Sequence, residues 1–169
     1  MTTERIDPPL AGDERTQLDS WLDYHRVTLA IKCEGLSAEQ LRERAIPSTT
    51  LTLLGLVRHM TEVERSWFRK ILEGEDAPDI YFSEHDRDAD FNDLMSHEPA
   101  EVFELWRLEI TRAREICEGR SLDELSKRID ERGELFSLRW IYLHMIEEYA
   151  RHNGHADLIR EAIDGAVGD

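Results

Sequence analysis

The chain has 169 residues and a formal net charge of −16. This length accommodates one domain with a complete hydrophobic core. The acidic balance argues against nucleic acids and anionic membrane surfaces as partners, because both attract basic patches. No apolar run approaches the roughly 18 residues of a membrane span, and the polar N-terminus lacks the apolar segment of a signal peptide. Cys33 and Cys117 stand far apart without a metal or disulfide pattern, so we expect a reduced, cytoplasmic protein.

The first third of the chain predicts an irregular arm followed by helices. Residues 1–12 contain two prolines and a glycine and should form an N-terminal arm, with residues 13–169 forming a single domain. A long helix is predicted from Asp13 to Gly35, where glycine favours termination. A short helix should follow, because Ser37 and Gln40 form a capping-box pattern. The expected apolar positions of the first helix are Leu18, Trp21, Leu22, Val27, Leu29 and Ile31.

A second long helix is predicted over residues 51–73, with caps offered by residues 48–50. Its buried stripe should consist of Leu53, Leu56, Met60, Val63, Trp67 and Ile71, and His59 lies within that stripe. Residues 75–97 are acidic, which favours a solvated connection. Four apolar residues in it indicate instead a lid or a partner surface, with Tyr81 or Phe82 packed near His59 or in a dimer contact, and these four are Ile80, Tyr81, Phe82 and Phe91.

Two further long helices complete the predicted fold. Pro99 suits the first turn of a helix that runs to about Glu118. Residues 129–135 should be extended or form a turn around Gly133, and Ser137 caps a last helix that runs to about Asp164. Four long amphipathic helices predict an all-α four-helix bundle with a long connection between the second and third long helices.

One stripe of the last helix carries ionisable groups. At about 100° per residue, His144, Glu148, His152 and His155 fall within roughly 80° of arc. Three imidazoles and a carboxylate that face a core need polar partners or a metal, because burying them unpaired costs several kcal/mol.

Glu148 and His152 are four residues apart and can bind one ion from a single helix face. His59 supplies a third ligand if the second and fourth long helices face each other. These ligand types suit zinc, nickel, iron or manganese, and three ligands leave a position open for water or substrate. Each residue alone also fits a plainer interpretation: His59 and His144 as hydrogen-bonded core histidines, and Glu148 as a solvated or ion-paired helix residue.

Segments spread over nearly the whole chain resemble the DinB-like (YfiT-like) superfamily of four-helix metalloproteins. These segments are residues 48–59 with Glu64 and Trp67, then Ser137-Leu-Arg-Trp140, and the run from His144 to Glu161. The chain is most similar to the actinobacterial branch that includes the Streptomyces mini-circle protein, and to the N-terminal domain of mycothiol-dependent maleylpyruvate isomerases. It lacks the additional domain of those isomerases, which argues against their particular reaction.

The resemblance implies that His59, Glu148 and His152 bind a divalent metal, with zinc as the leading expectation and nickel, iron or manganese as alternatives. It implies that His155, which stands where many relatives have glutamine, or His144 supports the ligands or acts as an acid–base group. It also implies a thiol-dependent S-transferase or isomerase that uses mycothiol and a small electrophile, and we expect a homodimer. The alternative is a non-catalytic bundle that binds a metal or small ligand and has a stress-related role.

Overall fold

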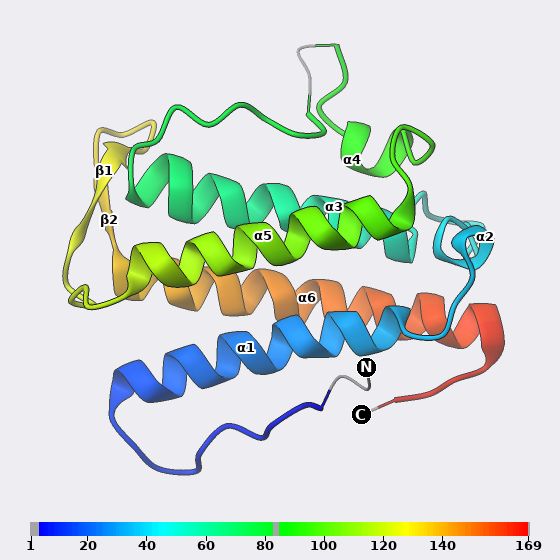
Figure 1. The fold of residues 1–169 in the computed structure, drawn as a ribbon, viewed down its shortest axis with the longest axis horizontal. Helices are drawn as coiled ribbons and strands as arrows, with labels where there is room; N and C mark the ends of the chain where they lie inside the picture. Colours follow the sequence, from blue (N-terminus) through cyan, green and yellow to red (C-terminus); the bar gives the residue numbers. More distant parts are fainter. Residues whose placement is uncertain (1–3, 83–84, 169) are drawn as a thin grey trace.

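The computed structural model describes residues 4–82 and 85–168, and the fold is mostly helical with one small antiparallel hairpin (Figure 1). The mostly helical class predicted from the sequence is therefore confirmed in outline. The long helical segments are α1 (Glu14–Cys33), α3 (Leu53–Glu64) with its continuation η1 (Arg65–Leu72), α5 (Pro99–Cys117) and α6 (Leu138–Asp164). The short helices are α2 (Ala38–Leu41) and α4 (Ala89–Asn92), and the strands are β1 (Leu125–Ile129) and β2 (Leu135–Ser137).

Side-chain caps fix the beginnings of the helices. Asp13 accepts from the backbone N–H of Thr16 at the start of α1, and Ser37 forms the predicted capping box with Gln40. Ser137 caps α6, as predicted. The predicted cap of the second long helix was wrong by a few residues, because Thr52 rather than residues 48–50 accepts the N–H of Gly55.

The hairpin lies at one end of the helices, and its strands extend on both sides of the turn predicted around Gly133 (Figure 1). The sequence predicted an extended segment or a turn at residues 129–135 but not a pair of strands, because both strands are short and give no clear alternation of buried and exposed residues. Gly133 has a φ of 81°, which non-glycine residues adopt rarely. The hairpin closes the end of the molecule at which α5 returns to α6.

The helices bury one continuous apolar core. α1 packs mainly on α6, and α3 lies between α5 and α6. Of the six apolar positions expected in α1, Leu18, Leu22 and Leu29 are buried in this core, whereas Trp21 is 45% exposed. The most completely buried apolar side chains include Leu22, Leu29, Leu53, Leu56, Met60, Phe68, Leu72, Leu138, Ile141 and Tyr149.

The second long helix changes its hydrogen-bonding pattern halfway along its length. From Arg65 to Leu72 the backbone forms a π-helix, which has more residues per turn than an α-helix. Beyond this point the buried positions are therefore displaced by one residue from those predicted with α-helical spacing. Phe68 and Leu72 are buried at 1% and 0% exposure, in place of Trp67 and Ile71, which are only partly buried.

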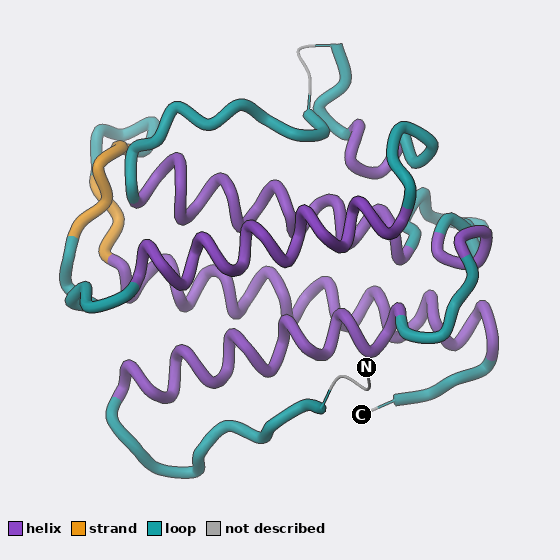
Figure 2. The backbone as a smooth tube through the Cα atoms, in the orientation of Figure 1, coloured by secondary structure: helices purple, strands orange, loops and turns teal. Residues whose placement is uncertain are grey.

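The acidic connection between η1 and α5 follows the outer side of α3 and contains α4 (Figure 2). Glu62, which is buried, accepts the backbone N–H groups of Ile80 and Tyr81 at 2.6 and 2.5 Å. Tyr81 is 6% exposed, and the Arg58 guanidinium lies 4.1 Å from its ring centroid. The interpretation of this stretch as a solvated segment was therefore wrong for these residues, which are fastened to α3.

A buried polar network connects all four long helical segments. The Arg26 guanidinium of α1 donates twice to the Glu64 carboxylate of α3, at 2.8 Å each. The Tyr149 hydroxyl of α6 donates to Glu64 at 2.8 Å and accepts from the Trp106 indole of α5 at 2.9 Å. Because each group has a partner, the buried charges are compensated rather than orphaned.

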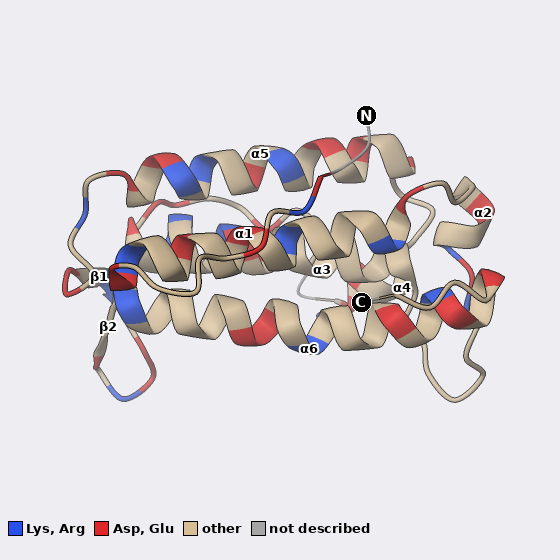
Figure 3. Ribbon diagram, turned by 90° about the horizontal axis from the view of Figure 1, so that it is seen from below, with Lys and Arg blue, Asp and Glu red and all other residues tan. Residues whose placement is uncertain are grey.

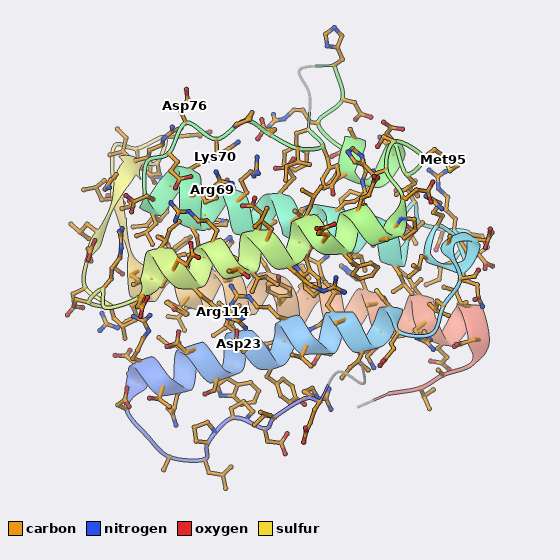
Figure 4. All side chains as sticks on the ribbon, in the orientation of Figure 1. Asp23, Arg69, Lys70, Asp76, Met95 and Arg114 are labelled. Atoms are coloured by element: carbon orange, nitrogen blue, oxygen red, sulfur yellow. The ribbon has the colours of Figure 1, made fainter. Side chains whose placement is uncertain are left out.

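Acidic and basic residues are interspersed along the exposed sides of α1, α5 and α6 (Figure 3). Arg114 and Asp23 face each other from α5 and α1 and form a 2.9 Å ion pair between these helices (Figure 4). Among the residues that the structure describes, no helix is both long enough and apolar enough to cross a membrane.

Candidate metal centre

The three residues predicted as metal ligands lie together between α3 and α6. His59 projects from α3, and Glu148 and His152 project from successive turns of α6. One donor atom from each can be chosen so that all three lie within 4.8 Å of one another. The Nε2 atom of His152 is 3.4 Å from Oε2 of Glu148, and the rings of His59 and His152 have centroids 4.7 Å apart. The structure thus places His59 beside the pair on α6, as the sequence predicted.

The donors are partly accessible to solvent. The exposed fractions of the side chains are 21% for His59, 21% for Glu148 and 11% for His152. The plainer interpretation of His59 as a hydrogen-bonded core histidine fits in part, because the ring contacts Asp90 at 2.8 Å but its side chain is not fully buried. The three side chains therefore lie near the protein surface and are not sealed in the core.

His152 is suited to act as a neutral ligand. Burial lowers its pKa to about 4, and the nearby His59 and His155 act in the same direction. The ring is then neutral at pH 7, which is the form that binds metals. Its Nδ1 atom lies 3.4 Å from Nδ1 of His155, so its Nε2 atom faces the site. His155 therefore stands behind a predicted ligand rather than among the three donors.

His144 lies on the other side of Glu148. Its Nε2 atom is 3.7 Å from Oε1 of Glu148, which is longer than a hydrogen bond. Its ring stacks on Trp140 with centroids 5.0 Å apart and meets the Trp67 ring edge-on at 4.5 Å. His144 is thus held by aromatic rings, with one nitrogen turned toward Glu148. Together with Glu147 and Glu148 it forms a second group whose donor atoms lie within 4.8 Å of one another.

Two residues at the site were not predicted to belong to it. Asp90 of α4 is 1% exposed, and its Oδ2 atom is 2.8 Å from Nδ1 of His59. Phe91 was one of the four apolar residues that indicated a lid, but Tyr81 or Phe82 was predicted near His59. Phe91 stacks on His59 with ring centroids 5.1 Å apart, whereas Tyr81 packs against Arg58. Asp90 is one of many acids in its stretch, and no sequence signal distinguished it.

The donor set fits a divalent metal ion. Two imidazoles and a carboxylate are ligand types that zinc and its neighbours accept, and their donor atoms are already close together. A catalytic zinc site commonly has three protein ligands and one open position. The partial exposure of these residues is consistent with such an open position.

A separate cavity of about 750 Å³ lies between α1, α5 and α6. None of the three predicted ligands lines it. The charged side chains that line it are largely paired with one another or with the backbone; Arg15, for example, donates to Asp19 and to the carbonyl oxygens of Cys117 and Arg120. We place the chemistry at the His59 site, because the cavity presents few free polar groups to a ligand.

A family model matches most of the chain. The model of the family described as mycothiol-S-transferase matches residues 17–165, which is most of the chain and includes all three predicted ligands. A search of curated proteins finds no match.

Proposed function

Because this chain belongs to the mycothiol-S-transferase family, which lies within the DinB-like superfamily, we propose that it is a metal-dependent enzyme. Its substrates would be mycothiol and a small electrophile. The observation that carries the proposal is the close approach of His59, Glu148 and His152, which come from two helices far apart in sequence. A structural role alone gives no reason for two imidazoles and a carboxylate to meet at a solvent-accessible point.

In this proposal His59, Glu148 and His152 hold one divalent ion, with zinc as the leading choice. A bound divalent ion lowers the pKa of a coordinated thiol and so makes thiolate available at neutral pH. The protein contributes by fixing the direction of the ligands. His152 is held between Glu148 and His155, and His59 is held against α4.

The reaction also needs a proton acceptor. The mycothiol S–H bond breaks, its proton passes to a base, and the sulfur forms a bond to carbon while the leaving group departs with its electron pair. We assign the base role to His144 or His155, which flank the ligands at 3.7 Å from Glu148 and 3.4 Å from His152. We favour His144 of the two, because its side chain is 23% exposed and its Nε2 atom is turned toward Glu148.

The remaining predictions belong to the same proposal. We propose that residues 13–169 form one domain, and that the four long helical segments constitute a four-helix bundle of the DinB-like type. We also propose a cytoplasmic homodimer. Size-exclusion chromatography with light scattering would test the dimer, and a monomer at all concentrations would exclude it.

The proposed activity is tested with mycothiol and chlorodinitrobenzene as the electrophile, by following conjugate formation. We expect turnover with the zinc-loaded protein, none with the metal-free protein, and a loss of at least about 100-fold in Glu148→Gln, because a neutral amide is a poor replacement for an anionic ligand. His85→Gln is the matched control, since His85 is exposed in the connection and should keep full activity. Zinc binding without thiol-dependent turnover of this and other electrophiles would favour the non-catalytic alternative.

A further inference from the structure

The short helix α4 brings a buried carboxylate to the back of a predicted ligand. Asp90 is 1% exposed, and its Oδ2 atom lies 2.8 Å from Nδ1 of His59. Its other oxygen, Oδ1, accepts the backbone N–H of Phe91 at 3.0 Å. Both oxygens are therefore engaged as acceptors, which is the only hydrogen-bonding role open to an ionised carboxylate.

This contact selects one form of the His59 ring. In a neutral imidazole one nitrogen carries hydrogen and the other has a free lone pair. Because Asp90 accepts at Nδ1, the hydrogen is held on Nδ1 and the lone pair is left on Nε2. With Nδ1 engaged by Asp90, Nε2 is the ring nitrogen that is left to bind an ion shared with Glu148 and His152.

Independent contacts hold α4 in the place that this arrangement requires. Arg58, next to His59 in sequence, is 1% exposed and donates to the carbonyl of Ala89 at 2.8 Å and to Ser96 at 2.9 Å. Arg58 of α3 therefore holds the chain both before Asp90, at Ala89, and after it, at Ser96. A chain segment that served only to connect η1 to α5 would not need a buried arginine to fix a single turn of helix.

The packing of Phe91 supports the same conclusion. Its ring stacks on His59, and it lies over Gly55, one turn earlier in α3. A Cβ atom at Gly55 would come within 3.0 Å of the Phe91 ring. The absence of a side chain at this buried helical position thus allows α4 to approach His59 closely.

We propose that Asp90 is a positioning residue that fixes His59 with its Nε2 lone pair toward Glu148 and His152, and that α4 is an integral part of the metal centre. The inference deepens the proposed function and rests on it where the metal is concerned. The acidic connection then has a specific role, because it supplies the carboxylate of Asp90 that contacts His59.

The test is ¹⁵N NMR of the His59 ring in the metal-free protein at about pH 8, together with zinc affinity by competition with a chelator. In the parent chain we expect hydrogen on Nδ1. In Asp90→Ala we expect the hydrogen to redistribute to Nε2 and zinc affinity to fall by about 10- to 100-fold, as is typical when a partner behind a metal-binding histidine is removed. The conservative variant Asp90→Glu should restore part of both properties.

Asp88→Asn is the matched control, because Asp88 belongs to the same turn but is exposed and its side chain does not cap α4. It should leave the His59 tautomer and the zinc affinity unchanged, and far-UV circular dichroism should show equal helix content in all variants. An unaltered His59 tautomer in Asp90→Ala would overturn the inference even if zinc binds normally. Failure of the parent chain to bind zinc would refute the proposed function, while the tautomer result would still decide the role of Asp90.

Discussion

Replacing His152, a predicted metal ligand, should change how strongly a bound metal stabilises the folded protein. A metal that binds only the folded chain stabilises it by about 2.7 kcal/mol when its free concentration is 100 times its dissociation constant. In His152→Ala we expect this metal-dependent gain in melting temperature to disappear. Helix content should stay nearly unchanged, because other buried side chains of α6, such as Ile141 and Tyr149, still hold this helix in the core. Equal melting of the parent chain with and without chelator, at confirmed metal occupancy, would refute this expectation.

The two cysteines should be nearly inert in the folded protein. Burial raises the pKa of the Cys33 thiol to about 12 and that of the Cys117 thiol to about 11, well above the usual range of a cysteine. The thiolate is the reactive form, so at about pH 8 both should react with a disulfide reagent only after urea is added. Because the folded-state pKa values are raised, these thiols favour the folded state below about pH 9, and this contribution is lost as pH rises toward 11–12. Rapid labelling without urea would contradict this account.

At the level of residues, spacing alone was enough to group Glu148 with His152, because residues four positions apart in a helix lie on the same face. His59 required the further assumption that its helix faces the last one, and the structure places it there. Asp90 could not be found in this way. Its contact with His59 depends on the path of a connection, and a connection has no periodicity from which a facing partner can be predicted.

The glycines in two long helices give a matched test of how closely α4 packs on α3. Gly154 of α6 is exposed, and nothing lies within 4 Å of an added Cβ atom. Gly154→Ala should therefore stabilise the protein by about 0.5–1 kcal/mol through helix propensity. In Gly55→Ala the added methyl would press on Phe91, so we expect a net loss of stability and weaker zinc binding. Urea unfolding of both variants tests this, and equal gains in the two would show that α4 does not pack tightly.

The ends of the elements followed from the sequence better than the interior of the second long helix did. Caps such as Ser37 and Ser137 carry a local chemical signal, and the structure confirms both. The π-helix from Arg65 to Leu72 has no such signal, and it displaced the predicted burial from Trp67 to Phe68. As a consequence the Trp67 ring, which is not in the core, contacts His144 beside the predicted ligands.

The network of Arg26, Glu64, Tyr149 and Trp106 joins the four long helical segments into one unit. Glu64→Ala would leave the buried Arg26 charge without its main partner, and removing one member of a buried ion pair typically costs about 3–5 kcal/mol. The double variant Arg26→Met, Glu64→Leu removes both charges together and should cost less than the sum of the single changes. Additive losses in urea unfolding would show that the two side chains do not act as a pair.

The central claim concerns the whole molecule, because the predicted ligands come from helices that only the complete fold brings together. The most direct measurement is the zinc content of the purified chain after dialysis, with His59→Ala, Glu148→Ala and His152→Ala measured beside His85→Ala. We predict one zinc ion per chain in the parent and in His85→Ala, and a large loss in each of the other three variants with helix content unchanged. Full zinc content in all three ligand variants, or none in the parent chain under saturating zinc, would contradict the assignment of this site.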